Sequence, residues 1–179
     1  MQKYIALLRG INVSGQKKIP MAELCHSLEK NGFEDVVTYI QSGNVVFSFD
    51  NSKKEILENK VQSVILESFG YEVPILIKTR EDIERILKDN PLTNNKVGES
   101  KQFYFVLLKN QPEEELKIKF ESEIYTNEDF YITADCVYLN CKLGYGKAKL
   151  NNNLVEQKLK VGATTRNYKT MLKLLELSK

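Results

Sequence analysis

The chain has few of the residue types on which common functional sites depend. Its 179 residues include one histidine, three cysteines, four prolines and no tryptophan. A single histidine excludes any site that needs two or more imidazoles, the usual multi-histidine zinc centres among them. No run of about 18 apolar residues is present, so the sequence predicts no membrane span. Because the N-terminus also lacks the small-residue cleavage site of a secretory signal, we expect a cytoplasmic protein.

What is present is typical of a soluble globular protein, with 42% apolar and 28% charged residues. The length suits one compact domain or two small ones that share a core. The net charge of +2 hides an uneven distribution of charge. Residues 1–18 hold four basic and no acidic side chains, 110–135 hold eight acidic and two basic ones, and 142–173 hold eight basic and one acidic. Two basic segments therefore stand out, and these would attract anionic ligands or partners.

Strand and helix patterns alternate along the first half of the chain. The apolar run over 3–9 is nearly continuous, as expected of a strand buried on both faces. The predicted strands are 3–9, 36–41, 44–49 and 73–78, and the predicted helices run from Pro20 to Gly32 and from Ser52 to Gly70. Ser52 with Glu55 reads as a capping box, and Ser42-Gly43 predicts a tight hairpin turn.

A similar order of elements begins again in the second half. Thr79 with Asp82 predicts the start of another helix, and 92–101 reads as a connecting loop. The predicted strands are then 103–109, 129–133 and 137–141, and the predicted helices are a short acidic one from Pro112, one over 149–159 and one over about 167–177. The sequence thus predicts an α+β fold of two tandem ferredoxin-like subdomains, βαββαβ and βαββα, with an extra C-terminal helix. We place the first subdomain at 1–79, a helix and linker at 80–101, and the second subdomain with the C-terminal helix at 102–179.

The loop after the first strand is the first candidate for chemistry. Gly10 and Gly15 have the spacing of a phosphate-binding P-loop, but no Lys-Ser or Lys-Thr pair follows, so the hydroxyl that would hold magnesium is missing. A P-loop nucleotidase is therefore rejected. Arg9, Asn12 and Lys17 still predict an anion-binding loop at the carboxyl end of a central strand. The structural alternative is a solvated connection with lysines on its surface.

Two further candidates lie in the last third of the chain. Thr165, Arg166 and Asn167 are expected at the start of the last helix, where free backbone amides and the helix dipole favour an anion. The alternative is that Thr165 only caps the helix and Arg166 is solvated. The glycine-rich stretch over 144–149 places Lys147 and Lys149 in a mobile basic loop, or else in a plain turn before a helix.

The remaining reactive residue types indicate no site. Cys25 and His26 are adjacent on a predicted helix, so their side chains point about 100° apart and form no nucleophile–base pair. Cys136 and Cys141 are an odd number of residues apart on one strand and face opposite sides. Neither a metal site nor a disulfide is expected, and the sequence indicates no cofactor. The strands also lack the aromatic motif of RNA-recognition domains.

Several segments together resemble an uncharacterised bacterial family, domain of unknown function 1697. The residues that carry the resemblance are ALLRGINV at 6–13, PMAEL at 20–24, GFEDV at 32–36, TYIQSGNVVF at 38–47 and TTRNYKT at 164–170. Three positions depart from the family pattern. Ser14 stands where glycine is frequent, Ala148 where serine is frequent, and Tyr168 where tryptophan is common.

The resemblance implies a small α+β protein from the bacterial cytoplasm, and it implies no established reaction. It points to a set of recurring residues: Arg9, Asn12, Ser42, Gly43, Asn44, Lys149, Thr165, Arg166 and Asn167. Several of these recurring residues also lie in the candidate loops described above, which the residue patterns indicate on their own.

Three functional hypotheses follow. The first is a basic cleft for a small phosphorylated or carboxylated ligand, which requires Arg9 and Arg166 to approach one another, with the Ser42–Asn44 turn at its rim. The second is a protein-interaction module or homo-oligomer, in which the basic segment meets an acidic surface. The third is single-stranded nucleic-acid binding through the two basic segments. Whether the protein is an enzyme stays open, since no general base stands out.

Overall fold

The computed structural model describes residues 1–13, 15–92 and 102–179. Ser14 and the predicted loop beyond Leu92 lie outside these described residues. The described ranges contain two four-stranded antiparallel sheets and six α-helices, which confirms the α+β class. The chain divides into two compact units, Met1–Arg85 with Lys173–Lys179 and Ile86–Leu172.

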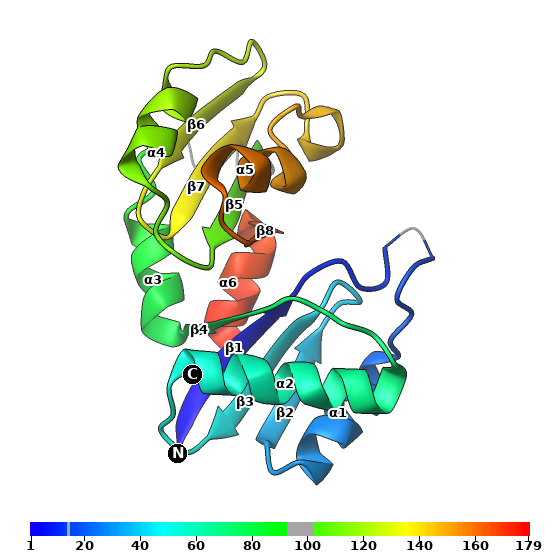
Figure 1. The fold of residues 1–179 in the computed structure, drawn as a ribbon. Helices are drawn as coiled ribbons and strands as arrows, with labels where there is room; N and C mark the ends of the chain where they lie inside the picture. The colour runs from blue at the N-terminus through cyan, green and yellow to red at the C-terminus, as the bar shows by residue number, and fades with distance from the viewer. Residues whose placement is uncertain (14, 93–101) are drawn as a thin grey trace. The chain divides into compact units, whose positions relative to one another are not determined.

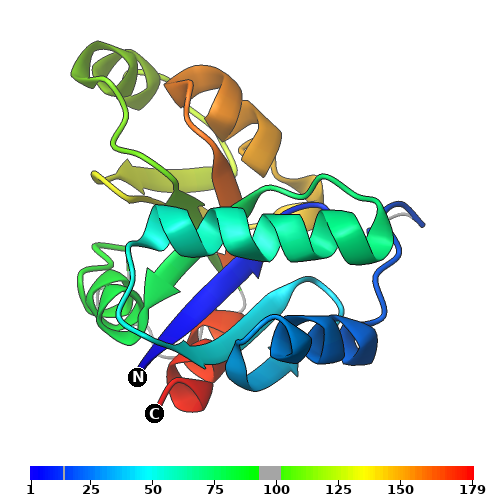
Figure 2. The ribbon, with the colours of Figure 1, turned by 60° about the horizontal axis from the view of Figure 1, so that its bottom comes forward.

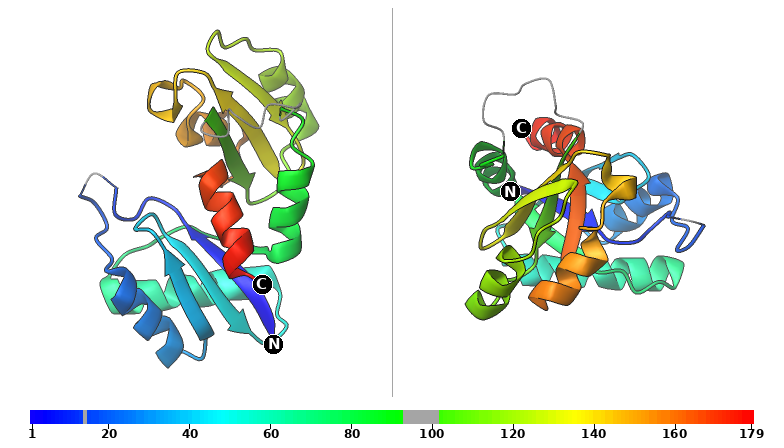
Figure 3. Two further views of the ribbon diagram at one scale, coloured as in Figure 1. Left: turned by 180° about the vertical axis from the view of Figure 1, so that it is seen from behind. Right: turned by 90° about the horizontal axis from the view of Figure 1, so that it is seen from above.

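The first unit contains one of the two sheets. Its elements are β1 (Gln2–Leu8), α1 (Met21–Lys30), β2 (Glu34–Tyr39), β3 (Asn44–Phe49), α2 (Lys54–Phe69), β4 (Ile75–Thr79) and the start of α3 (Arg80–Lys88). The strand order is β2-β3-β1-β4, and each neighbouring pair is antiparallel. Figures 1 and 2 show α1 and α2 on one face of this sheet, and the view from behind in Figure 3 shows the strands in front of them.

The core of this unit lies between the sheet and the two helices. Alternate residues of β1, among them Tyr4 and Leu8, join Leu24 of α1 and Val61 of α2 in one buried apolar cluster. Ile5 faces the other side of the sheet and is also fully buried. Burial on both faces of β1 agrees with the uninterrupted apolar run in the sequence, and each such side chain stabilises the fold by about 1.5–3 kcal/mol.

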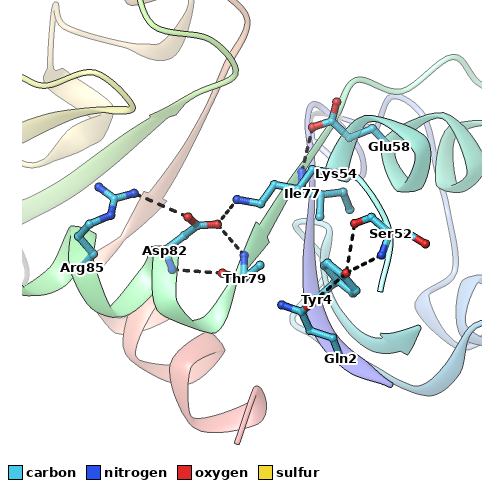
Figure 4. Close-up of polar contacts among 9 residues, drawn as sticks. All are labelled: Gln2, Tyr4, Ser52, Lys54, Glu58, Ile77, Thr79, Asp82 and Arg85. Carbon is cyan, nitrogen blue, oxygen red and sulfur yellow. Dashed lines mark hydrogen bonds and ion pairs between the residues drawn. The ribbon is translucent and has the colours of Figure 1, made fainter. Parts of the chain in front are cut away.

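Polar side chains of the first unit form hydrogen bonds with its backbone, as Figure 4 shows. The buried carboxylate of Glu58 in α2 accepts the backbone N–H of Ile77 in the edge strand β4 at 3.1 Å. An edge strand leaves backbone groups unpaired, so this bond protects it. The Tyr4 hydroxyl accepts the Ser52 N–H at 3.0 Å, and the residue before α2 is Lys53, with no side-chain cap. The predicted Ser52 capping box is therefore wrong, because Ser52 is bound to Tyr4.

The second unit holds the other sheet. Its elements are β5 (Phe103–Leu108), α4 (Glu114–Glu121), β6 (Glu128–Ile132), β7 (Cys136–Cys141), a short 3-10 helix η2 (Tyr145–Lys147), α5 (Asn152–Leu159), β8 (Ala163–Asn167) and the start of α6 (Tyr168–Leu177). The order β6-β7-β5-β8 repeats that of the first sheet, again with antiparallel pairs. In Figure 1, α4 and α5 cover one face, where Val106, Phe120, Leu139 and Val155 form a buried cluster.

One strand of this sheet was not expected. The sequence predicted three strands in the second subdomain and placed residues 164–167 at the start of the last helix. Residues 163–167 instead form β8, which pairs with β5 from Ala163↔Leu108 to Asn167↔Tyr104. The stretch ATTRN contains two β-branched threonines, which favour an extended backbone, and α6 begins directly after it at Tyr168.

Candidate functional site

In the first unit, the predicted site residues gather at the carboxyl end of β1. The N–H of Leu8 donates to the carbonyl of Gly43, and the N–H of Arg9 donates to the carbonyl of Pro74. Further along the loop, Asn12 reaches the carbonyl of Gln41. The β2–β3 turn and the segment before β4 therefore flank the loop that follows β1.

Asn12 fastens this loop internally. Its amide nitrogen donates to the carbonyls of Ile19 and Gln41, both at 2.9 Å, and its amide oxygen accepts the N–H of Ile19 at 2.8 Å. Its backbone has a φ of 53°, in the left-handed region that asparagine tolerates better than most residues. Both amide hydrogens of Asn12 are thus used within the chain, so its role is to hold the loop in place.

The β2–β3 turn is held in a similar way. Asn44 is fully buried, and its amide nitrogen donates to the carbonyl of Tyr39 and to the hydroxyl of Ser42, each at 3.1 Å. Gly43 has a φ of +78°, and a Cβ there would lie 2.6 Å from the Cβ of Leu8. Ser42 and Asn44 therefore build a turn that lies tightly against the end of β1.

The two cations of this loop differ in their surroundings. Lys17 has a φ of 43°, and its ammonium donates to the backbone carbonyl of Glu72. Arg9 is partly exposed at the end of β1. The positive charge predicted here is present, and the Lys17 contact ties the loop to the segment that leads into β4.

In the second unit, Arg166 lies on β8 rather than at a helix start, and its side chain is buried. Its guanidinium donates to the hydroxyl of Thr164 at 2.8 Å and to the carbonyl of Thr165 at 2.9 Å. Burial lowers the pKa of Arg166 to about 10, so the side chain remains charged at neutral pH. The prediction that free helix amides bind an anion here is wrong, because the backbone at Arg166 belongs to a strand.

Asn167 is the residue that caps the last helix. Its side-chain oxygen accepts the N–H of Thr170 at 2.8 Å, the bond that an N-cap residue makes to the third residue of a helix. The sequence assigned this cap to Thr165, two residues earlier. The error follows from the missed strand, because a helix that begins at Tyr168 takes its cap from Asn167.

Thr165 takes part in a hydrogen-bonded network instead. The Tyr145 hydroxyl donates to Thr165 Oγ1 at 3.1 Å, and Thr165 Oγ1 donates to the Asn152 side chain at 2.9 Å. The Tyr145 hydroxyl also accepts the Asn152 N–H at 3.0 Å, and its ring stacks on that of Tyr104 at 4.7 Å between centroids. Burial raises the pKa of Tyr145, although the bonds to Thr165 and Asn152 oppose the rise. Sequence reasoning missed Tyr104 and Asn152, whose roles depend on pairing between distant segments.

The network fixes the stretch that carries Lys147 and Lys149. Tyr145 opens η2, and Asn151 begins α5 by accepting the N–H of Leu154 at 3.0 Å. Between these two anchors, Lys147 and Lys149 are both exposed. The predicted helix over 149–159 therefore starts later, at Asn152, and both lysines lie in the connection before it.

Lys147 and Lys149 line one small pocket. Its volume is about 80 Å³, and its other walls are Thr126, Asn127 and Glu128, at the start of β6. Neither ammonium forms an ion pair within the described part of the chain. The sequence placed the two lysines in one basic loop, and the contribution of β6 was not foreseen.

A second pocket of about 240 Å³ lies between α4 and α5 of the same unit. Its lining residues are Leu116, Lys119, Phe120, Gln157, Lys158 and Lys160. Here one lysine is already neutralised, because the ammonium of Lys158 pairs with Glu123 at 2.5 Å. The pocket has a larger apolar component than the one at Lys147.

The predicted residues thus form two groups. Arg9, Asn12, Lys17, Ser42 and Asn44 lie in the first unit, and Lys147, Lys149, Thr165, Arg166 and Asn167 lie in the second. Among the residues that the structure describes, no three histidine, cysteine or acidic side chains are placed to hold a metal ion. The helices within the same ranges include none that is long and apolar enough to cross a membrane.

Comparisons with known proteins agree with the resemblance seen in the sequence. The chain is similar in structure to the conserved bacterial protein SP0830 from Streptococcus pneumoniae, with a TM-score of 0.76 and 25% identity over 99% of this chain and 98% of that one. A comparison with curated proteins gave no match. The family described as "Protein of unknown function (DUF1697)" matches residues 1–138, well over half of the chain. The chain therefore belongs to this family of proteins of unknown function.

Proposed function

We propose that the protein binds a small anionic ligand, phosphorylated or carboxylated, in the pocket lined by Lys147 and Lys149. The observation that carries this proposal is that both lysines face one pocket and neither has an ion-pair partner among the described residues. Two ammonium groups are the donors that a phosphate or a carboxylate accepts most strongly. A volume of about 80 Å³ suits one such group rather than a whole nucleotide.

The surroundings of the pocket support this function. Thr126 and Asn127 add polar groups to the lining of the same pocket. Tyr145 and Asn151 hold the two ends of the lysine-bearing connection, so the ammonium groups are presented from a fixed segment. A fixed site loses less conformational entropy on binding than a free loop does.

The fold that carries this pocket supports a finer description. We propose that each half is a ferredoxin-like subdomain, within 1–79 and 102–179, joined by the helix and linker of 80–101. The support is the shared strand order, β2-β3-β1-β4 and β6-β7-β5-β8, with antiparallel pairing throughout both sheets. β8 supplies the fourth strand that the βαββα pattern lacked. Because the resemblance is to a bacterial family, we also propose that the protein is bacterial and cytoplasmic.

Nucleic-acid binding is less well supported. RNA-binding sheets of this kind stack bases on exposed aromatic rings of their central strands. In β1 and β3, Tyr4 and Phe47 are 2% and 0% exposed and belong to the apolar core. In β5, Phe105 is 0% exposed and Tyr104 stacks on Tyr145. These rings are therefore occupied by packing.

Titration with inorganic phosphate tests the anion site. Full-length protein labelled with ¹⁵N is titrated, and the amide shifts of residues 126–128 and 147–149 are followed by NMR. The double variant Lys147→Ala/Lys149→Ala is expected to bind at least about tenfold more weakly, because it loses two charge-assisted hydrogen bonds of about 1.5–3 kcal/mol each.

The control removes the same charge elsewhere in the second unit. Lys119→Ala/Lys169→Ala takes away two exposed lysines that do not line this pocket. We expect this variant to bind phosphate like the wild type. Equal weakening in both double variants would show that phosphate responds only to net charge, and shifts confined to Lys119, Phe120 and Lys160 would move the site to the larger pocket.

A further inference from the structure

The pocket is lined by a carboxylate for which the described residues provide no partner. Glu128 is the first residue of β6, is 6% exposed and lines the pocket together with Lys147 and Lys149. Its carboxylate accepts no hydrogen bond and forms no ion pair with any residue that the structure describes. Its carboxylate oxygens are not among the buried polar atoms that lack a partner, so they are open to the pocket, where a cationic group of a ligand can bind them.

The adjacent residue shows the contrast. Asp129 is exposed, and its carboxylate pairs with the Lys142 ammonium at 2.9 Å and accepts the Asn140 amide at 3.3 Å. Among the described residues, the carboxylate of Asp129 therefore has a cationic partner and that of Glu128 has none. Lys147 and Lys149 line the same pocket as Glu128, yet neither ammonium lies within ion-pairing distance of it.

The negative charge of Glu128 acts on its neighbours as well. Cys141, its pairing partner on β7, has a pKa raised to about 11, mainly by burial and further by the charge of Glu128. The pocket therefore combines one carboxylate with the ammonium groups of two lysines among its lining residues. Complementarity to such a pocket requires a molecule that presents both signs of charge.

We infer that the ligand is a small zwitterion whose anionic group binds Lys147 and Lys149 and whose amino group binds Glu128, an inference that rests on the proposed function of the same pocket. The chemical class is an amine beside a phosphate or a carboxylate, as in aminoalkyl phosphates and amino acids. The amine donates to the Glu128 carboxylate, which accepts no hydrogen bond from the side chains or backbone of the described residues. Glu128 then selects among anions that the lysines alone would accept.

Two probes that differ in one amino group test this selection. O-Phosphoethanolamine and ethyl phosphate carry the same phosphate on the same two carbons, and only the first carries an ammonium. Titrations of the ¹⁵N-labelled full chain give a dissociation constant for each. We expect O-phosphoethanolamine to bind about tenfold or more tightly, the gain from one charge-assisted hydrogen bond in a buried site.

The variant Glu128→Gln keeps the size of the side chain and removes its charge. It should bind O-phosphoethanolamine about as weakly as ethyl phosphate, while its affinity for ethyl phosphate stays equal or rises. Its amide spectrum and thermal midpoint show whether it is folded, and we expect its stability to stay close to that of the wild type because no hydrogen bond or ion pair among the described residues is lost.

Each outcome separates the inference from the proposed function. If both probes bind wild-type protein equally and Lys147→Ala/Lys149→Ala abolishes both, the anion site stands and the zwitterion inference is wrong. If Glu128→Gln leaves the preference for O-phosphoethanolamine intact, Glu128 is not its receptor and the inference is also wrong. If neither probe shifts the amides of residues 126–128 and 147–149 at millimolar concentration, both are overturned for this pocket.

Discussion

The two halves of the chain have the same order of helices and strands, but their long connecting segments lie at different places in that order. From β1 to α3 and from β5 to α6, strands and helices follow in the same order, and both sheets have the same strand order. The agreement extends to single hydrogen bonds. The N–H of Arg9 donates to the carbonyl of Pro74 at 3.0 Å, and that of Lys109 to Gly162 at 2.8 Å.

The outer strands β4 and β8 show the same likeness. In each, a helix carboxylate accepts a backbone N–H: Glu58 takes that of Ile77, and Glu156 takes that of Ala163 at 2.7 Å. Each strand then runs directly into a helix, β4 into α3 and β8 into α6. Lys78 and Arg166 occupy corresponding positions, each opposite a buried residue of the central strand and each itself buried.

The difference lies in the connections. The first half has its long loop between β1 and α1, over 9–20, where the second half has only 109–113. The second half has its long connection between β7 and α5, over 142–151, where the first has only 50–53. The candidate lysines, Lys17, Lys147 and Lys149, lie in these unshared segments. The segments that carry the proposed binding lysines are thus those in which the halves depart from each other.

Among substitutions that test the likeness of the two halves, Gly43→Ala is expected to have the largest effect on stability. The new Cβ would lie 2.6 Å from Leu8 Cβ and 3.1 Å from the Ile11 side chain, in a backbone with a φ of +78°. We expect the free energy of unfolding to fall by about 2–4 kcal/mol, from overpacking and strain together. Chemical denaturation followed by circular dichroism measures it.

The matched control is Gly146→Ala in the second half, where nothing lies within 4 Å of the added Cβ and no positive φ is required. Its unfolding free energy should change by no more than about 0.5 kcal/mol. Equal losses in the two variants would mean that the close approach of the β2–β3 turn to β1 does not set the stability of the first half.

A smaller effect is expected from Asn12→Ala, which removes the three hydrogen bonds that hold the long loop of the first half. It also places alanine at a φ of 53°. We expect a loss of about 2–3 kcal/mol in the free energy of unfolding, because the backbone N–H and carbonyl of the buried Ile19 lose their partner and alanine is strained at this φ. The variant should also expose the amides of residues 12–19 to faster hydrogen exchange.

Its counterpart in the second half is Asn151→Ala, which removes a single capping bond to Leu154. The expected loss is about 1 kcal/mol, the usual cost of an N-cap. If Asn12→Ala cost no more than Asn151→Ala, the loop of the first half would be held by its cations rather than by Asn12.

Local patterns in the sequence predicted most of the fold. The apolar run of β1, the helical stripe of α1 and the Thr79–Asp82 cap of α3 all follow from spacing within a few residues. β8 was missed because ATTRN lacks apolar alternation, and its strand character comes from pairing with β5. A strand stabilised by distant partners leaves a weak local signal.

The candidate site was less predictable for the same reason. The sequence identified Lys147 and Lys149 as basic residues in one loop, but their pocket is completed by Glu128, which lies on β6. The sequence placed Arg166 and Asn167 at the start of a helix, but Arg166 is buried on a strand and only Asn167 caps the helix. Whether a charged side chain on a strand faces solvent or the interior depends on the pairing register of the sheet.

The smallest expected effect on stability concerns α3 and α6, the two helices that follow the outer strands. Charged groups cap α3, and a neutral side chain caps α6. Asp82 accepts the Thr79 N–H at 2.8 Å and pairs with the ammonium of Lys54 (Figure 4). Burial raises the pKa of Asp82, but the bonds from Lys54 and Thr79 outweigh it and leave the pKa below the ordinary 3.8. A lowered pKa in the folded state means that the stabilisation is complete above the unfolded pKa and is lost as the pH falls through the folded one.

Asp82→Asn should therefore destabilise the first half by about 1 kcal/mol at pH 7, a figure kept small because Lys54 is partly exposed to screening solvent. The difference from wild type should begin to shrink as the pH falls below about 4, the ordinary pKa of the unfolded chain, and should be lost as the pH falls through the lowered pKa of folded Asp82. Asn167→Asp makes the reverse change at α6 and should add a stabilisation that appears only as the pH rises, since a carboxylate at a helix N-terminus is favourable. Hydrogen exchange of the α3 and α6 amides from pH 3 to 7 measures both changes. A difference between Asp82→Asn and wild type that is independent of pH would show that the cap acts through its hydrogen bond alone, and the two helix starts would then be equivalent.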